Sequence, residues 1–275
     1  MNGKPGFEDE ASLSPAPSRH APLVERVIAA MHRGDGALRL GTMAEMANLS
    51  PYHFTRTFRR ITGVPPGEFL TAVRLERAKQ LLLGTEMGVA EVCFEVGYES
   101  VGTFATRFKD LVGLPPGMIR RLPEGLYEAL ARAGGEAWPM LPSPTGAGVA
   151  FRVHGQDLAG CLVFAGLFPS AVPHGRPVAG AVLGAPGSHR LHLVPDGRYH
   201  LMAATLPRSQ DPWKLLAPGD ALRVGRARYP VIVRRGQTDG PVEVALRPAQ
   251  LTDPPVLVAL PNLLLERLTS GRNHP

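Results

Sequence analysis

Two stretches of the chain combine hydrogen-bonding and basic side chains at helical spacing. In the first, Tyr52, Thr55, Arg56 and Arg59 recur at steps of three and four residues, so a helix places them on one face. Arginine pairs with guanine O6 and N7, whereas hydroxyl groups hydrogen-bond to bases or touch a thymine methyl. His53 lies at the edge of this face. The chemistry that these residue types favour is recognition of nucleic-acid bases.

The second stretch follows about fifty residues later and is much poorer in donors. Its corresponding face carries Gly102, Ala105, Thr106 and Lys109, with Val101 near its start. Small and methyl-bearing residues contact thymine methyl groups, and a single lysine suits a phosphate. We therefore expect the first stretch to supply most of the hydrogen-bonded base readout and the second to contribute apolar contacts and anchoring.

Two sets of candidate contact residues follow from these faces. The residues expected to contact bases are Tyr52, His53, Thr55, Arg56, Val101, Gly102, Ala105 and Thr106. The residues expected to contact phosphates are Ser50, Arg59, Arg60, Ser100, Arg107 and Lys109, partly because backbone N–H groups at a helix start bind anions.

A repeated string positions both stretches. Phe58 to Leu70 is "FRRITGVPPGEFL", and Phe108 to Arg120 is "FKDLVGLPPGMIR". Around each copy, apolar residues at i, i+4 and i+7 mark the buried stripe of one helix. The two stripes are Phe54, Phe58 and Ile61, and Phe104, Phe108 and Leu111. Helices are therefore predicted at about residues 51–61 and 101–111.

Start and stop signals delimit these two helices. Ser50, followed by Pro51, suits an N-cap with proline in the first turn, and Ser100 is placed to cap the second helix. Gly63 and Gly113 suit the left-handed end of each helix, and the prolines after them prevent its continuation. The repeated string is thus the exit from each helix and not a catalytic loop.

A shorter helix precedes each of the two, at about 42–47 and 89–96. The intervening turns contain Asn48 and Gly97, which tolerate the left-handed backbone of a tight turn. Short helix, tight turn and capped second helix form a helix-turn-helix, here present twice. The amphipathic segment 69–83 is predicted to be a rigid helix that connects the two units.

This pattern resembles the DNA-binding domain of the AraC/XylS family of bacterial transcription regulators. The resemblance covers about residues 21–122 and rests on the double unit, on the strut pattern and on the "VGY" before the second helix. The strut residues are Arg74, Leu75, Ala78, Leu81 and Leu82. It implies an all-α, homeodomain-like fold that binds double-stranded DNA through two successive major-groove segments. Thr106 stands where the family often has a long polar residue.

From Val149 the helical period is absent. Short apolar runs such as "CLVFAGLF", "RYHLMAA" and "VEVAL" recur every 8–12 residues between Pro, Gly, Asp and Asn, which is typical of a small antiparallel β-sandwich. "HRLHLVPDGRYHLMAA" loosely resembles the carboxypeptidase regulatory-like, or transthyretin-like, sandwich, which implies an accessory fold without chemistry of its own. The final "LPNLLLERL" is predicted to be a short helix.

The multidomain chain, part α and part β, is thus divided into four segments. Residues 1–19 are Gly-, Ser-, Pro- and acid-rich and are predicted to be a disordered tail. The double helix-turn-helix occupies 20–122, a short helix (124–133) and a linker occupy 123–147, and the β-sandwich occupies 148–275. Most AraC/XylS members carry their effector domain before the DNA-binding half. Because the order is reversed here, the family's usual ligand and regulatory mechanism are not carried over.

Composition favours binding over catalysis. The net charge is +6, but residues 20–122 carry 13 basic and 10 acidic residues and 148–275 carry 14 and 8, so the charge does not locate the binding surface. Two scattered cysteines, Cys93 and Cys161, form neither a disulfide framework nor a zinc motif. We expect no catalytic residues, no metal and no cofactor. We also expect no membrane segment or signal peptide, and a cytoplasmic location.

Two functions are compatible with these features. The favoured one is a sequence-specific transcription regulator that binds promoter or operator DNA, with RNA polymerase as a further partner. Its β domain would serve in assembly, as a homodimerisation domain, or in interdomain regulation. Sensing of a small-molecule effector ranks below these two roles, and contact with flanking DNA through exposed arginines ranks lowest. The alternative is a carbohydrate- or peptide-binding module whose helical part is structural. DNA binding with a steep salt dependence separates the two.

Overall fold

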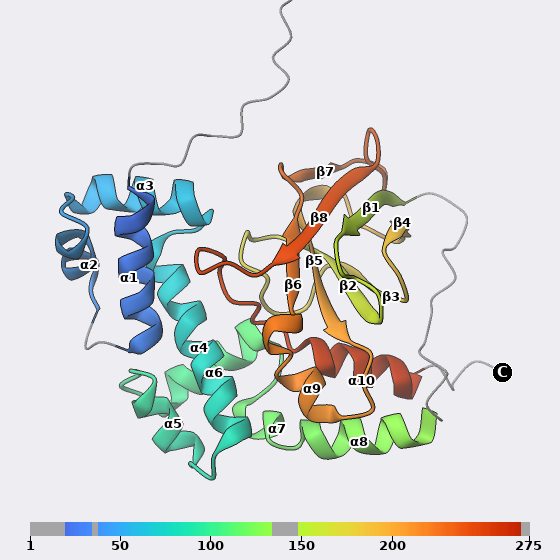
Figure 1. Cartoon of the computed structure of the whole chain (residues 1–275), viewed down its shortest axis with the longest axis horizontal. Coiled ribbons are helices and arrows are strands. Elements are labelled where there is room, and N and C mark those ends of the chain that lie inside the picture. The colour runs from blue at the N-terminus through green and yellow to red at the C-terminus, as the bar shows by residue number, and fades with distance from the viewer. Residues whose placement is uncertain (1–19, 35–37, 134–147, 271–275) are drawn as a thin grey trace, which may run out of the picture.

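The computed structural model describes residues 20–34, 38–133 and 148–270 (Figure 1). The predicted tail, 1–19, and nearly all of the predicted linker lie outside the described residues. The first half is helical, as expected. Its helices are α1 (Ala21–Arg33), α2 (Leu40–Met46), α3 (Pro51–Thr62), α4 (Pro66–Gly84), α5 (Val89–Glu95), α6 (Val101–Val112), α7 (Pro116–Ile119) and α8 (Leu122–Ala133).

The helix ends follow the sequence signals. Gly34, Gly63 and Gly113 end α1, α3 and α6 in the left-handed conformation, with φ of 75°, 85° and 92°. Only glycine adopts this backbone without steric cost. Pro65 and Pro115 then immediately precede α4 and α7 with extended ψ, which stops one helix and starts the next.

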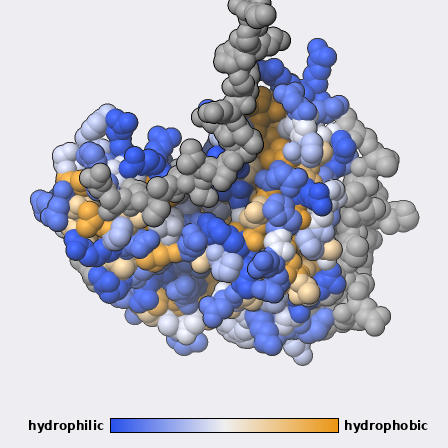
Figure 2. All heavy atoms as spheres, turned by 45° about the horizontal axis from the view of Figure 1, so that its top comes forward, coloured by the Kyte–Doolittle hydropathy of each residue, from blue (hydrophilic) through white to orange (hydrophobic). Residues whose placement is uncertain are grey.

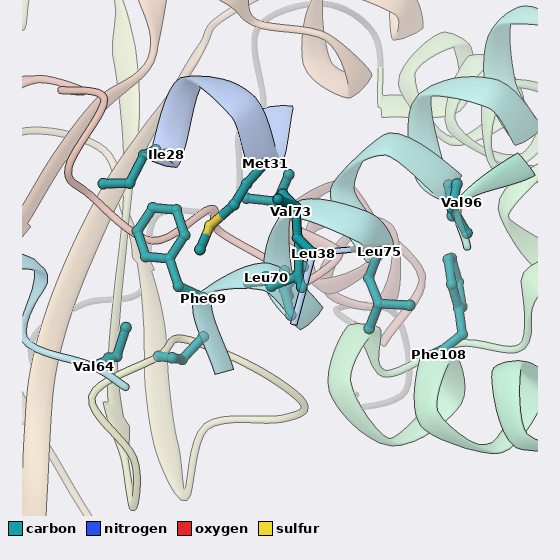
Figure 3. Close-up of a cluster of buried hydrophobic side chains, with 14 of the residues drawn as sticks. Ile28, Met31, Leu38, Val64, Phe69, Leu70, Val73, Leu75, Val96 and Phe108 are labelled. Carbon is teal, nitrogen blue, oxygen red and sulfur yellow. The ribbon is translucent and has the colours of Figure 1, made fainter. Parts of the chain in front are cut away.

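The long helix α4 lies between the two helix-turn-helix units. Figure 3 shows Phe69 and Val73 of α4 next to Met31 of α1, and Leu75 on the side of Phe108 from α6. These side chains are buried in one continuous core. α4 is therefore a shared wall that fixes α3 and α6 against the same scaffold.

The second half is β-rich, with three short helical segments. Its strands are β1 (Val149–Gly155), β2 (Cys161–Phe168), β3 (Ala179–Leu183), β4 (Gly187–Leu191), β5 (Gly197–Pro207), β6 (Arg223–Arg226), β7 (Val231–Val233) and β8 (Val242–Pro248). Its helical segments are α9 (Pro212–Leu216), the 3₁₀ turn η1 (Gly219–Ala221) and α10 (Leu260–Ser270), the last of which was predicted.

These strands do not divide into two separate sheets. They follow one hydrogen-bonded order, β3-β2-β5-β6-β8-β1-β4, with β7 paired to β5. The end strands β3 and β4 are joined by only three residues, so the sheet curls and brings its two ends together. A β-rich region is thus confirmed, whereas the sandwich is not, and β1 pairs with β8 in parallel.

The curled sheet buries side chains on both faces. Inside, Phe151, Val163, Leu201 and Val244 belong to one core. The outer face of β2, β3 and β5 forms a second core with α8, α9 and α10, in which Leu126 and Leu264 are fully buried. Helix α8 therefore packs on the β-rich half, and in Figure 1 it lies alongside α10.

Backbone hydrogen bonds join the two halves. Gly175 N donates to Leu111 O (2.6 Å) and Ala259 N donates to Val112 O (3.2 Å), both at the end of α6. Val172, Leu257 and Ala259 are buried in the core of the helical half. In Figure 2 hydrophobic residues reach the surface in a band between the two halves. None of the described helices is long and apolar enough to cross a membrane.

Candidate nucleic-acid interface

The two helix-turn-helix units have the same local construction. Asn48 and Gly97 adopt positive φ, 52° and 83°, in the turns before α3 and α6. The Ser50 hydroxyl accepts a hydrogen bond from His53 N and the Ser100 hydroxyl accepts one from Thr103 N, each at 3.4 Å. The predicted caps are therefore confirmed. Both serines are exposed, so each capped helix start is open to solvent.

On α3 the predicted apolar and polar sides separate cleanly. Phe54 and Phe58 are fully buried, whereas the side chain of Tyr52 is 74% exposed. His53, Arg56, Arg59 and Arg60 are exposed as well. The Arg56 guanidinium carbon lies 5.9 Å from the centre of the Tyr52 ring, a cation–π distance that groups the two side chains.

The Thr55 hydroxyl already forms a hydrogen bond within α3. It donates to Pro51 O at 2.8 Å, and the residue is half-buried. Its proton is therefore unavailable to a base acceptor unless that bond breaks. The side chain still offers its methyl group and a free oxygen lone pair.

On α6 the predicted face is exposed but has few donors. Val101, Gly102, Thr106 and Lys109 are exposed, and Ala105 is half-buried. Phe104 and Phe108 are fully buried on the opposite side. The two helices thus begin with the same capped backbone, but the side chains that they expose to solvent are very different.

Arg107 is held by a partner that the sequence did not reveal. Burial raises the pKa of the Tyr98 hydroxyl, and Arg107, whose side chain hydrogen-bonds to this hydroxyl, opposes the shift. Tyr98 also packs edge-on against Phe104, with ring centres 5.4 Å apart. Arg107 therefore links α6 to the preceding turn, in addition to any phosphate contact.

Two more arginines brace this surface and were missed from sequence. A Cβ on Gly97 would lie 3.2 Å from Nη2 of Arg74, so this α4 side chain lies directly against the turn before α6. A Cβ on Gly63 would collide with the guanidinium of Arg226 from β6. The first contact was detectable in principle from the strut pattern, whereas the second joins residues too distant in sequence to be inferred.

The two exposed faces lie at opposite ends of α4. α3 ends three residues before α4 begins, and α5 and α6 follow its other end. With 19 residues, α4 is about 28 Å long at 1.5 Å per residue. One helical turn of DNA is about 34 Å, so the strut is of suitable length to span neighbouring groove segments.

The described residues contain no cluster of three His, Cys, Asp or Glu side chains that could hold a metal ion. Cys93 is buried, and burial raises the pKa of its thiol. Such a thiol is a poor nucleophile, because the thiolate is the reactive form.

Comparison with known proteins identifies the helical half. The helix-turn-helix domain family matches residues 43–122. The HTH-type transcriptional activator AarP of Providencia stuartii is 30% identical over 93 residues, which cover 34% of this chain and 69% of AarP. An HTH-type transcriptional regulator of Haemophilus influenzae is 35% identical over 95 residues, covering 34% of this chain and 32% of that protein.

Other relatives and solved structures match a similar share of the chain. The bifunctional transcriptional activator and DNA repair enzyme AdaA of Bacillus subtilis is 33% identical over 85 residues, 31% of this chain and 40% of AdaA. Among solved structures, the C-terminal domain of the response regulator AraT from Geobacillus stearothermophilus is 34% identical and covers 38% of this chain and 88% of that one, with a TM-score of 0.36. The DNA-binding domain of AdpA in complex with target DNA is 25% identical and covers 42% and 98%, with a TM-score of 0.35.

The chain belongs to the AraC-type helix-turn-helix transcriptional regulators. It spans about a third of the length of the Haemophilus relative and two fifths of the Bacillus relative.

Proposed function

We propose that this protein is a sequence-specific transcription regulator that reads two successive major-groove segments of double-stranded DNA with α3 and α6. One observation carries the proposal: two equivalently capped helices expose the faces opposite their buried Phe residues at opposite ends of the rigid strut α4. One chain would therefore read an asymmetric site without two-fold symmetry.

The two helices would divide the work unequally. Arg56, with Tyr52 beneath it, would supply bidentate guanine contact, and His53 would add a further donor or acceptor. Thr55 would contribute its methyl group because its hydroxyl proton is already used. On α6, Val101, Gly102, Ala105 and Thr106 would make close apolar contact with the groove.

Phosphates would fix the position of the chain on DNA. The solvent-exposed Arg59, Arg60 and Lys109 would contact phosphates, together with the backbone N–H groups next to Ser50 and Ser100. Arg107 would contribute while it remains attached to Tyr98. The domain division at residues 122 and 148, a cytoplasmic site of action, contact with RNA polymerase and homodimerisation through the β-rich half remain proposals of the same kind.

The test is selection of random-sequence duplex DNA by the full-length chain, followed by sequencing. We expect one asymmetric motif in two blocks, about 10–10.5 base pairs apart. Affinity for that motif should fall steeply with salt. A plot of the logarithm of the affinity against the logarithm of the salt concentration should have a slope of about −0.9 for each phosphate contacted. Absence of any enriched motif would refute the proposal, and a single block would refute reading by both helices.

A further inference from the structure

A large cavity lies on the outer face of the curled sheet, beside the junction of the two halves. It has a volume of about 430 Å³, within the roughly 300–1,000 Å³ typical of small-molecule sites. Its floor consists of β2, β3, β5 and β6, and its opposite wall is residues 253–263. None of the residues proposed to contact DNA lines it.

The strand register explains the character of the floor. Val182, Phe164, Ala204 and Val224 form one cross-strand row, because each is paired with the next across neighbouring strands. Paired residues of antiparallel strands project from the same face. Ala204 is the smallest member of this row. Phe168, Val258 and Leu263 complete a largely apolar lining.

The next row gives the cavity a positive end. Gly166 pairs with Met202, and Met202 pairs with Arg226, so Arg226 projects from the cavity face. Three arginines, Arg176, Arg226 and Arg247, and one carboxylate, Asp253, line the cavity, which leaves an excess of two positive charges.

The arginines differ in their partners. Arg247 is bound by both carboxylate oxygens of Asp253, at 2.6 and 2.8 Å. In the described part of the structure the Arg226 side chain makes neither a hydrogen bond nor an ion pair. It is exposed, its guanidinium rests against Gly63 at the end of α3, and its charge helps to lower the pKa of Asp253. An apolar chamber with a guanidinium at one end that no carboxylate pairs directly is complementary to a small molecule with an apolar body and one anionic group.

The cavity walls are also the segments that hold the DNA-reading half. Leu257 N donates to Pro173 O (3.2 Å), and Ala259 N donates to Val112 O at the end of α6. Lys79 of α4 donates to Val256 O at 3.0 Å. Any occupant that displaces residues 253–260 or draws Arg226 inward therefore acts directly on the ends of α3 and α6.

We propose that this cavity binds a small apolar monocarboxylate and that its occupancy changes the affinity of the protein for DNA. The carboxylate would pair with Arg226, and the apolar body would fill the space above Ala204. The binding claim stands on the cavity alone, whereas the coupling claim rests on the proposed function.

The first experiment is calorimetric titration of the full-length chain with naphthoate, and with naphthyl methanol as its uncharged counterpart. We expect naphthoate to bind at least about tenfold more tightly. Arg226→Gln should remove that advantage, whereas Arg228→Gln, an exposed arginine just beyond β6 that does not line the cavity, should retain it. Ala204→Leu should abolish binding of both molecules while circular dichroism shows an unchanged fold.

Three outcomes would overturn the binding claim. They are no binding of naphthoate, equal binding of the uncharged molecule, and undiminished binding to both the Ala204→Leu and Arg226→Gln variants.

The second experiment measures affinity for the selected DNA motif with and without saturating naphthoate. Allosteric coupling changes affinity by about fivefold or more, so a change of that size is expected in the wild type and not in Arg226→Gln. An unchanged affinity would refute the coupling. Failure of the chain to select any DNA would instead refute the proposed function, and the calorimetric result would still decide the binding claim.

Discussion

At the scale of single residues, the contact surface depends on which side chains are already engaged. Tyr52 and Arg56 face solvent together, but the Thr55 hydroxyl is bonded to its own helix and Arg107 is held at Tyr98. Side chains of the same polarity and similar position therefore differ in how readily they meet DNA. Base recognition is consequently expected to concentrate at Arg56.

Replacement of Arg56 tests whether base recognition depends mainly on this residue. Arg56→Ala should weaken binding to the selected motif by about 1–3 kcal/mol and relax preference at one base pair. Fluorescence anisotropy with the motif and its single-base variants measures both effects. Arg152→Ala, an exposed arginine on β1, is the matched control. If Thr106→Ala altered base preference more than Arg56→Ala, the unequal division between α3 and α6 would be wrong.

At the scale of elements, the exits from the two reading helices depend on glycine. Gly113 ends α6 with φ of 92°. The carbonyl oxygen of the preceding residue, Val112, accepts the hydrogen bond from Ala259 N. The backbone conformation at this glycine thus sets the direction in which α6 meets the β-rich half.

Substitution of Gly113 should therefore destabilise the protein. A left-handed backbone costs a residue with a Cβ about 1–2 kcal/mol, and Gly113→Ala should lower the unfolding free energy by that amount in urea titrations. Gly41→Ala is the opposite control: Gly41 is helical and has no atom within 4 Å of an added Cβ, so alanine should stabilise by about 0.5–1 kcal/mol. Equal effects of the two substitutions would contradict this account.

The connection between β2 and β3 adds a pH-dependent element. His174 lies in this connection; burial lowers its pKa, and the charge of Glu68 partly opposes the shift. Because the folded pKa is below the unfolded value of about 6.5, the unfolded chain binds the proton more readily. Stability should therefore fall as the pH drops below about 6.5, and His174→Gln should reduce that fall. Identical pH profiles of the two proteins would exclude a contribution from His174.

At the scale of the whole molecule, the two halves share a core. Leu257 comes from the segment after the last strand, yet it is 1% exposed and packs in the helical core. The β-rich half therefore contributes to the scaffold on which α3 and α6 are mounted. This arrangement also makes an isolated fragment ending near residue 122 an incomplete version of the helical half.

Shortening the Leu257 side chain at this junction should destabilise the helical half. Leu257→Ala should reduce the unfolding free energy by about 2–5 kcal/mol, the usual range for such cavities, and should speed hydrogen exchange in α4 and α6. Leu246→Ala removes the same side chain from the interior core of the sheet. Its largest exchange increase should lie in the strands. An equal increase in α4 and α6 from both variants would argue against a shared core.

The sequence by itself determined the elements of the helical half and the faces of its reading helices. The Phe stripes, Ser50, Ser100 and the left-handed glycines act within a few residues, so local pattern was sufficient to place them. The same local logic found β2 to β8 at least in part, but missed β1, whose alternating buried Val149, Phe151 and Val153 form only one short run.

Only the tertiary structure decided which segments that are distant in sequence contact one another. The parallel pairing of β1 with β8 and the junction of Val112 with Ala259 join residues about 90 to 150 positions apart, and no period in the sequence encodes such contacts. The same holds for Arg226, an exposed residue at the end of β6. Packing placed it between the end of α3 and an apolar cavity, because a side chain's neighbours across a fold are set by how surfaces fit together and not by the residues beside it in the chain.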